Sequence, residues 1–355
     1  MFGYLDRQCV HCCYYRNMKI KFGIVGCGYI AQRHAEHIMK HPDGQLVSGF
    51  DLKSEKCSAF AGKFGTAITH SAAQVYSNSE IDIISICTPN GIHHSVAIEA
   101  LKAGKHVLIE KPMSISTAHC KEIILASEQY NREIFIVKQN RYNPPVQAVK
   151  KLIDLGKLGE IYYITTNCFW NRGEDYYKQS DWKGSRALDG GTLFTQFSHF
   201  IDIFYYLFGD ITNIHGRIKN SNHQGLIDFE DTGSFIFDFL CGAQGSLNYT
   251  TCTYNTNMEG SITIFAENAT IKMGGKYLNT IDFQSTKGFD ITNLETSEKA
   301  NNYGFYEGSM SNHDKVIDNV ISTLQGKSVK MTSALEGMQV VNIIERMYAH
   351  VANKE

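Results

Sequence analysis

Short apolar runs recur through the first 140 residues of the chain, separated by stretches in which apolar positions have helical spacing. A second apolar run, which ends at Asp51, follows the first helical stretch. The pattern predicts strands at Ile20–Val25, near Ala67, at Ile81–Cys87, His106–Ile109 and Ile134–Lys138, and helices at Ser95–Ala103 and Ile115–Tyr130. Such alternation is typical of a parallel, doubly wound sheet with helices on both faces. Residues 18–140 are therefore predicted to form an α/β domain of the Rossmann type.

The pattern of residue types changes after Gly159, where long runs of β-branched and aromatic residues indicate a second sheet. We expect its strands at Ile161–Trp170, Ile211–Ile218, Gly233–Leu240, Gln244–Thr253 and Ser261–Phe265, mainly antiparallel and open on one side. An aromatic-rich helix is expected at Phe194–Phe208, and closing helices at Asn312–Leu324 and Ala334–Ala352 are expected to pack back across the fold. Residues 141–355 are thus predicted to form a second domain.

A glycine-rich turn, Gly26-Cys27-Gly28-Tyr29-Ile30-Ala31, follows the first predicted strand and opens a helix. Gly26 permits a tight turn, Gly28 lets the backbone approach a pyrophosphate, and the small Ala31 lets helix and strand pack closely. Asp51 stands 20 residues beyond Ala31, where a carboxylate can bind an adenosine ribose and repel a 2′-phosphate. The spacing predicts NAD, in preference to NADP, as the cofactor, with Tyr29 and Ile30 in the binding turn.

The composition limits the classes of binding partner that we expect for the protein. The 355 residues carry 34 Lys plus Arg against 36 Asp plus Glu, a net charge of −2, which gives no global reason to expect nucleic acid or a membrane surface. A soluble, cytoplasmic protein is predicted. Residues 1–17 are expected to be a disordered extension; its Cys9, His11, Cys12 and Cys13 lack a second ligand pair at zinc spacing, so no metal is predicted.

Two loops should lie at the carboxyl ends of parallel strands, where ligands bind in such sheets. They are Thr88-Pro89-Asn90-Gly91-Ile92-His93 and Glu110-Lys111-Pro112. Thr88, Pro89, Asn90, His93, Glu110 and Lys111 are therefore candidate cofactor contacts. Lys111 is also a candidate base for alcohol oxidation, because desolvation and a positive nicotinamide ring would lower its pKa. Its alternative reading is a surface lysine beside a turn proline.

His199 is the second candidate base. Gln196 and Asp202 lie three residues to either side, which places all three near one face of the predicted helix. Asp202 would orient the imidazole while Gln196 holds a substrate hydroxyl. A core histidine satisfied by a backbone carbonyl is the alternative.

Cations and aromatic residues interleave in the segment from Trp170 to Arg186. Such a mixture suits a sugar nucleotide, because rings stack on a base or sugar and cations bind phosphate or carboxylate. A solvated loop is the alternative. The segment contains Trp170, Arg172, Tyr176, Tyr177, Lys178, Trp182, Lys183 and Arg186, and Asn140 and Arg141 at the predicted domain crossover are further candidate substrate contacts.

Together, the sequence motifs of the chain resemble those of the glucose–fructose oxidoreductase and inositol dehydrogenase (Gfo/Idh/MocA) family. The resemblance rests on Gly26-x-Gly28-x-x-Ala31, Thr88-Pro89-Asn90-x-x-His93, Glu110-Lys111-Pro112 and Gly190-Gly191 followed by Ser198-His199-x-x-Asp202. It implies a Rossmann domain, a C-terminal α/β domain with an open sheet, and a homodimer or homotetramer assembled through that sheet. It also implies that Lys111 and His199 form the catalytic pair, with the role of each left open.

Further motifs look like those of the bacterial UDP-N-acetylglucosaminuronate 3-dehydrogenases. They include Lys138-Gln139-Asn140-Arg141, Trp182-Lys183-Gly184, Leu188-Asp189-Gly190-Gly191 and Glu230-Asp231-Thr232-Gly233. The resemblance implies oxidation of the C3 hydroxyl of a UDP-sugar acid for surface-polysaccharide (lipopolysaccharide) synthesis. Thr195 stands where inositol dehydrogenases carry aspartate, and Lys183 where the nearer subgroup is expected to carry arginine. A dehydrogenase of another sugar or cyclitol, an NAD-retaining glycosidase and a non-catalytic NAD(H) sensor are the alternatives.

Overall fold

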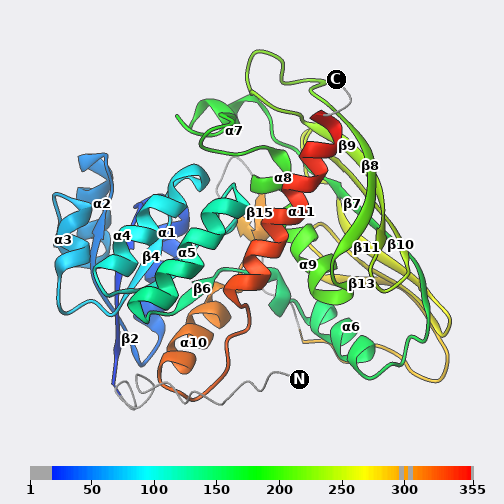
Figure 1. Ribbon diagram of the computed structural model, residues 1–355, viewed down its shortest axis with the longest axis horizontal. Coiled ribbons are helices and arrows are strands. Elements are labelled where there is room, and N and C mark those ends of the chain that lie inside the picture. The colour runs from blue at the N-terminus through cyan, green and yellow to red at the C-terminus, as the bar shows by residue number, and fades with distance from the viewer. Residues whose placement is uncertain (1–17, 296–299, 303–306, 353–355) are drawn as a thin grey trace.

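The computed structural model of the protein describes residues 18–295, 300–302 and 307–352, so the predictions for residues 1–17 lie outside the described residues. The first half of the chain forms a six-stranded parallel sheet in the order β3-β2-β1-β4-β5-β6 (Figure 1). Its strands are β1 (Ile20–Val25), β2 (Gly44–Phe50), β3 (Ala67–Ile68), β4 (Ile83–Ile86), β5 (His106–Ile109) and β6 (Ile134–Ile136). This is the doubly wound α/β order that the alternating pattern predicts.

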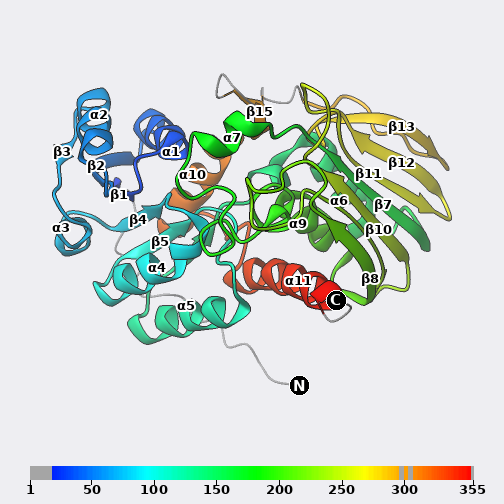
Figure 2. The ribbon, with the colours of Figure 1, turned by 90° about the horizontal axis from the view of Figure 1, so that it is seen from above.

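Helices cover both faces of this sheet (Figure 2). They are α1 (Tyr29–Lys40), α2 (Ser54–Phe64), α3 (Ala72–Ser77), α4 (His93–Lys102) and α5 (Thr117–Tyr130), with a short 3₁₀ turn η1 (Asn90–Ile92) before α4. One face is buried with α1 and, from the far end of the chain, α10 (His313–Leu324). The closing helices therefore do pack back across the fold, as the sequence predicts.

The second sheet has seven strands in the order β13-β12-β11-β7-β10-β9-β8. Its strands are β7 (Ile161–Phe169), β8 (Ile211–Lys219), β9 (Thr232–Phe239), β10 (Gln244–Thr250), β11 (Glu259–Ala266), β12 (Ala269–Gly274) and β13 (Thr280–Thr286). The β7–β10 pair is parallel and every other pair is antiparallel. The mainly antiparallel sheet is thus confirmed, and β12 and β13 extend it beyond the predicted strands.

Aromatic packing joins the second sheet to its helices. The rings of Phe204 on α9 (Ser198–Phe208) and of Phe237 on β9 lie 5.5 Å apart. The helix α11 (Ala334–Ala352) stands between the two sheets in Figure 1 and belongs to a hydrophobic cluster that also contains β4, β5 and β9 residues. One apolar core therefore runs through both halves of the molecule.

The helix predicted at Phe194–Phe208 differs from the structure. Two helices occupy that stretch, α8 (Thr192–Thr195) and α9, with a break at Gln196 and Phe197. Both polar ends of the Gln196 side chain bind other segments, which fixes the chain at the break. The remaining elements are η2 (Gln139–Tyr142), α6 (Pro144–Asp154), α7 (Glu174–Lys178), β14 (Ala300–Asn302) and β15 (Glu307–Met310).

Candidate active site

The glycine-rich turn between β1 and α1 has the shape that a dinucleotide requires. Gly26 has φ of +92°, and a Cβ there would lie 2.5 Å from the carbonyl oxygen of Cys87. Beside Gly28, by contrast, no atom lies within 4 Å of a Cβ position, and this residue begins α1 without a side-chain cap. The first turn of α1 therefore presents its amides to open space, which suits a pyrophosphate.

Asp51 directly follows β2 and is fixed on both sides. Its Oδ2 accepts a hydrogen bond from the Cys27 amide at 2.8 Å, and its Oδ1 accepts one from the Lys53 amide at 3.0 Å. Tyr29 is exposed in the first turn of α1, Ile30 is half-buried, and Ala31 is fully buried against the sheet. The strand, turn, helix and acid are thus arranged as the sequence predicts, and the residues present fit NAD.

His93 holds the two loops at the carboxyl ends of β4 and β5 together. Its Nδ1 lies 2.8 Å from the carbonyl oxygen of Pro112 and its Nε2 lies 2.9 Å from that of Thr88. The ring is completely buried, and burial lowers the pKa of His93 below its usual value. His93 therefore positions the loops that carry Thr88, Pro89 and Lys111, and does not itself face a ligand.

Glu110 also points into the core. Its Oε1 lies 2.8 Å from Nε2 of His34, whose Nδ1 lies 2.7 Å from Ser85 Oγ, and its Oε2 accepts the Lys111 amide at 3.1 Å. Burial disfavours the charged form of Glu110, yet the neighbouring His313 and His34 hold the pKa of Glu110 well below its usual range. Glu110 thus fixes the backbone of Lys111 through the hydrogen bond to its amide. The Glu110 carboxylate is bound by residues of the core and is not placed as a direct cofactor contact.

Lys111 reaches from the first half of the molecule to the second. Its Nζ donates a hydrogen bond to the carbonyl oxygen of Thr195 at 2.7 Å. Burial lowers its pKa to about 8, with Lys138 and Arg172 acting in the same direction and Glu110 and Asp189 opposing them. A lysine of this pKa exchanges protons near neutral pH, which a general base for alcohol oxidation requires.

His199 lies on α9, four residues beyond Thr195, and is buried. Burial, Lys111 and Lys138 together hold its pKa well below its usual range, so the imidazole is neutral and able to accept a proton. The structure differs from the expectation that Asp202 orients this ring. Both oxygens of Asp202 instead accept hydrogen bonds from Arg141, at 2.8 and 3.0 Å.

Arg141 consequently belongs to a buried ion-pair network, which we call the balanced cluster (Lys138, Arg141, Asp202 and Glu336). Its Nη1 lies 2.8 Å from Glu336, and Lys138 Nζ lies 3.4 Å from Asp202. With no exposed surface and its guanidinium bound on two sides, Arg141 is not placed to contact a substrate. The neighbouring Asn140 differs, because both polar atoms of its buried amide have no hydrogen-bond partner among the described residues.

Arg172 is buried beside the rings of Trp170 and Tyr176, with its guanidinium carbon 5.0 and 5.2 Å from their centroids. It donates to Gln196 Oε1 at 2.7 Å and to Asn257 Oδ1 at 3.1 Å. Gln196 in turn donates to the Tyr176 hydroxyl at 2.7 Å. Gln196 therefore joins the predicted basic segment to the break between α8 and α9.

Lys183 lies over the Tyr176 ring, with Nζ 3.7 Å from the centroid. Burial and Arg172 lower its pKa to about 8, while Asp189 acts against them. We call Lys111, Arg172, Lys183 and Asp189 the cationic cluster. Trp170 and Tyr177 are buried behind it, and Trp182 is half-buried. Lys178 is exposed and pairs with Glu174, so the structure does not bring it to this cluster.

Asp189 and Asn257 are members of the site that the sequence did not single out. Asp189 is buried immediately before Gly190, in a motif read only as part of a resemblance. Its position just ahead of the glycine pair was the available signal. Asn257 lies in a loop with no motif around it, and only its contact with Arg172 marks it.

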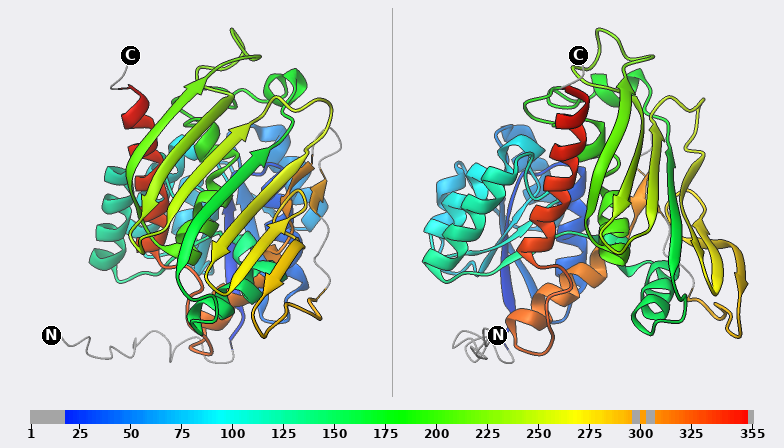
Figure 3. Two further views of the ribbon diagram at one scale, coloured as in Figure 1. Left: turned by 90° about the vertical axis from the view of Figure 1, so that its right-hand side faces the viewer. Right: turned by 45° about the vertical axis from the view of Figure 1, so that its right-hand side comes forward.

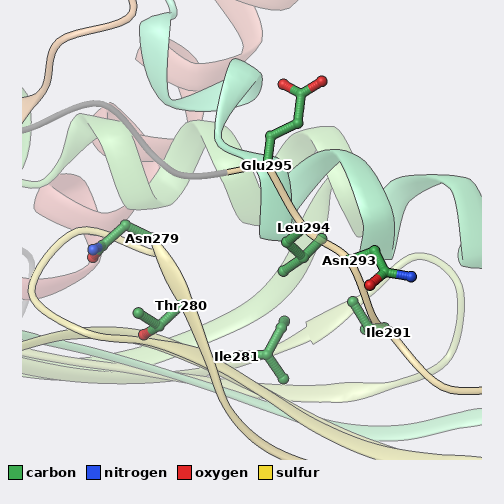
Figure 4. A pocket seen from close by; sticks show the side chains of 7 residues that line it. All are labelled: Asn279, Thr280, Ile281, Ile291, Asn293, Leu294 and Glu295. Carbon is green, nitrogen blue, oxygen red and sulfur yellow. The ribbon is translucent and has the colours of Figure 1, made fainter.

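A surface hollow of about 550 Å³ lies elsewhere, along β13 and the segment that follows it (Figure 4). Its lining shares no residue with the clusters described above. A helix long and apolar enough to cross a membrane does not occur in the described parts of the chain.

A parallel sheet with a dinucleotide turn, a lysine of lowered pKa at a strand end and a neutral histidine opposite define the class of NAD-dependent oxidoreductases. The family description "Oxidoreductase family, NAD-binding Rossmann fold" matches residues 20–138, and "Oxidoreductase family, C-terminal alpha/beta domain" matches residues 150–355. The chain belongs to this Gfo/Idh/MocA family, and it is an NAD-dependent sugar oxidoreductase.

Among solved structures, the WlbA dehydrogenase of Bordetella pertussis, in complex with NADH and UDP-GlcNAcA, is 32% identical with a TM-score of 0.86, over 96% of this chain and 97% of that one. The WlbA dehydrogenase of Chromobacterium violaceum, with the same two ligands, is 30% identical with a TM-score of 0.85, over 96% and 95%. An uncharacterized oxidoreductase of Streptococcus pneumoniae is 28% identical over 222 residues, 61% of this chain and 58% of that relative.

Proposed function

We propose that the protein oxidises the C3 hydroxyl of UDP-N-acetylglucosaminuronic acid with NAD to give the 3-keto sugar. The observation that carries the proposal is the grouping of three cations in the cationic cluster. Lys111 and Lys183 both act on Asp189, and Arg172 acts on both lysines. Glu110 also acts on Lys111 but is itself paired with His34. Cations grouped beside aromatic rings attract a negatively charged sugar nucleotide, so this site suits an anionic substrate.

The surroundings of the cluster favour a sugar that carries a carboxylate. Arg172 has the planar fork that binds carboxylates, and aromatic rings flank it. Asn140, with its unpartnered buried amide at the carboxyl end of β6, offers a donor and an acceptor to hydroxyl groups. The two WlbA structures, which hold UDP-GlcNAcA together with NADH, support the same substrate.

The two candidate bases have complementary states in this proposal. His199 is neutral because burial and nearby lysines lower its pKa, so it takes the hydroxyl proton. Lys111, with a pKa of about 8, donates a hydrogen bond to the same oxygen as it gains negative charge. The two roles could be exchanged between the residues. When bound, NAD supplies the acceptor for the hydride that leaves C3.

The first test mixes purified protein, with its bound cofactor oxidised and quantified, with UDP-N-acetylglucosaminuronic acid. Absorbance of reduced nicotinamide and the mass of the sugar are followed together. NADH formation with loss of two hydrogens supports the proposal, and a burst of a single turnover would mean that NAD stays bound and is recycled. Bound NAD with no change in either signal would reject this substrate.

The same assay separates the alternatives. Cleavage of a glycoside without net NADH would indicate an NAD-retaining glycosidase, and oxidation of a neutral sugar or cyclitol would indicate another dehydrogenase. NAD binding without turnover of any of these would indicate a sensor. A cytoplasmic location and a role in surface-polysaccharide sugar synthesis belong to the main proposal, and deletion of the gene should then alter the surface polysaccharide.

We also propose that the protein is a homodimer or homotetramer that assembles through the outer face of the second sheet. In Figure 3 (left) this face is turned to the viewer and no described helix crosses it. Tyr163, Ile236 and Phe265 are exposed apolar side chains on it, and Ile236 is exposed between the buried Phe235 and Phe237. Ile236→Glu should therefore yield a smaller species in sedimentation analysis, and an unchanged mass would contradict this assembly.

A further inference from the structure

Thr195 is the point where both halves of the molecule meet at the site. Its carbonyl oxygen accepts the hydrogen bond from Lys111 Nζ at 2.7 Å. Its hydroxyl accepts one from Asn90 Nδ2 at 2.7 Å and donates one to Asp189 Oδ1. A residue of α8 thus holds side chains from the loops after β4 and β5 and the carboxylate of Asp189, which precedes α8.

The segment around Asp189 is bound to the same loop of the first half. Asn90 Nδ2 also donates to the Asp189 carbonyl oxygen at 2.8 Å, and the Gly91 amide donates to that of Leu188 at 2.8 Å. A Cβ on Gly91 would lie 2.1 Å from the carbonyl oxygen of Ala187, so only glycine permits this approach. The Nδ2 group of Asn90 therefore joins the two halves, and contact of Asn90 with the cofactor stays a prediction.

Asp189 is 1% exposed, and its Oδ2 accepts the Gly184 amide at 2.8 Å. A carboxylate that served only to close this turn would need one oxygen. The second oxygen of Asp189 is directed to Thr195, whose carbonyl holds Lys111. We propose that Asp189 is a positioning residue, which acts through the Thr195 hydroxyl to place the Lys111 amine and supplies the negative charge that Lys111 and Lys183 share.

This inference rests on the proposed function, because it takes Lys111 as the amine that acts on the substrate. It also accounts for the departure at position 195. The resemblance to inositol dehydrogenases implies an aspartate there, whereas here the Thr195 hydroxyl binds the carboxylate of Asp189, six residues earlier in the chain. The site thereby keeps one negative charge near Lys111 but sets it back from the substrate, which leaves room for an anionic sugar.

The charges around the two groups agree with this arrangement. Lys111 is acted on by Glu110 and Asp189, which raise its pKa, and by Lys138 and Arg172, which lower it. Burial raises the pKa of Asp189 to about 6, while Thr195, Gly184, Lys111 and Lys183 act in the opposite direction. Asp189 is therefore ionised at pH 8, where Lys111 titrates, and its loss should lower the pKa of the Lys111 ammonium.

The test measures the Lys111 amine directly, without any substrate. Full-length protein is labelled competitively with acetic anhydride from pH 6 to 10, and the acetylation of Lys111 is followed by peptide mass spectrometry. Asp189→Asn is compared with Asp181→Asn, the same substitution eight residues earlier in the chain. The carboxylate of Asp181 is exposed and lies 2.9 Å from Lys53. Thr195→Val and Thr195→Ser separate the hydroxyl from the rest of the side chain.

Asp189→Asn should move the midpoint of Lys111 labelling about one unit lower, as expected for loss of a nearby opposite charge. Asp181→Asn should leave the midpoint in place. Thr195→Val should keep the midpoint within a few tenths of a unit but lower kcat about tenfold with KM for the sugar unchanged, because the amine is misplaced and not discharged. Thr195→Ser should restore kcat.

The Asp189→Asn protein must be folded and still bind NADH. If its Lys111 labelling is then unchanged, the claim that Asp189 supplies negative charge to Lys111 is overturned. If that variant does not fold, Thr195→Val and Thr195→Ser decide: equal kcat in the two would remove the relay. Failure of the proposed function is a separate result. It would appear as no oxidation of UDP-N-acetylglucosaminuronic acid by the unaltered protein, whereas the labelling comparison between Asp189→Asn and Asp181→Asn would still stand.

Discussion

The molecule contains two clusters of buried and half-buried charged residues of the same kinds, and they differ in how the cations are bound. The balanced cluster sets Lys138 and Arg141 against Asp202 and Glu336, two cations and two carboxylates. The cationic cluster sets Lys111, Arg172 and Lys183 around Asp189. Arg141 and Arg172 are both almost fully buried, so burial and residue type do not tell them apart.

The hydrogen-bond partners do tell them apart. Arg141 makes a two-pronged contact with one carboxylate and a further bond to another, which is the geometry of a structural ion pair. Arg172 donates instead to the neutral oxygens of Gln196, Asn257 and Asn171. The first cluster is a set of ion pairs, whereas Arg172 in the second is bound by neutral side-chain and backbone oxygens and stacks on aromatic rings.

The largest expected effect comes from removing the reactive amine of the cationic cluster. Lys111→Met should lower kcat about 100- to 10,000-fold, because it deletes a group that exchanges or shares the substrate proton. Stability and NADH affinity should stay close to those of the unaltered protein. Steady-state kinetics and fluorescence titration measure both. His199→Asn should fall in the same range, and turnover near normal in both variants would exclude this pair.

Breaking the ion pairs of the balanced cluster should instead lower the free energy of unfolding. Asp202→Asn leaves Arg141 and Lys138 buried with half of their negative charge removed, and such a loss destabilises by about 3–5 kcal/mol. Urea unfolding followed by circular dichroism measures the change. The variant that remains folded at low temperature should keep its KM for the sugar within about threefold. A large rise in KM with normal stability would mean that this cluster also binds substrate.

Arg172→Met should act mainly on binding. A hydrogen bond to a charged group contributes about 1.5–3 kcal/mol, so KM for the acidic sugar nucleotide should rise about 10- to 100-fold. UDP-N-acetylglucosamine serves as the control ligand, because it has the same diphosphate but lacks the sugar carboxylate. Equal losses for both ligands would show that Arg172 supports the pocket walls and does not select the carboxylate.

A change in pH should also distinguish the clusters. Burial lowers the pKa of Lys183 to about 8, and an anion bound beside it would raise that value. The affinity for the acidic sugar should therefore fall as pH rises through about 8, whereas the balanced cluster holds Asp202 ionised and Arg141 protonated throughout. Calorimetric titration from pH 7 to 9.5 measures this. Lys183→Arg should remove the contribution of Lys183 to the pH dependence and leave that of Lys111, whose pKa is also about 8.

The smallest effect is expected at Lys178. This residue belongs to the same basic segment as Lys183 but is exposed and paired with Glu174, and surface ion pairs contribute about 0–1 kcal/mol. Lys178→Ala should leave KM, kcat and the melting temperature almost unchanged. A tenfold rise in KM would show that the segment rearranges on binding and carries Lys178 into the site.

The sequence predicted most of the first sheet, because most of its strands are short, largely apolar segments bounded by turn residues. Strands β1 and β5 occur at the predicted bounds, and the glycine turn and Asp51 occupy the positions that their spacing indicated. Predictions failed where tertiary contacts override a local pattern. The aromatic stretch before Phe208 reads as one helix, yet the contacts of Gln196 with Arg172 and Tyr176 accompany a break in it.

Residue identity and spacing alone determined the fold class, the cofactor and the two candidate bases, because hydrophobic period and glycine placement act over short stretches of chain. The tertiary structure decided which charges are paired. Asp202 is one turn from His199 along the helix but binds Arg141, and Asp189 reaches Lys111 only through Thr195. Electrostatic partners are set by distance in space and by burial, and neither can be read from the order of residues in the chain.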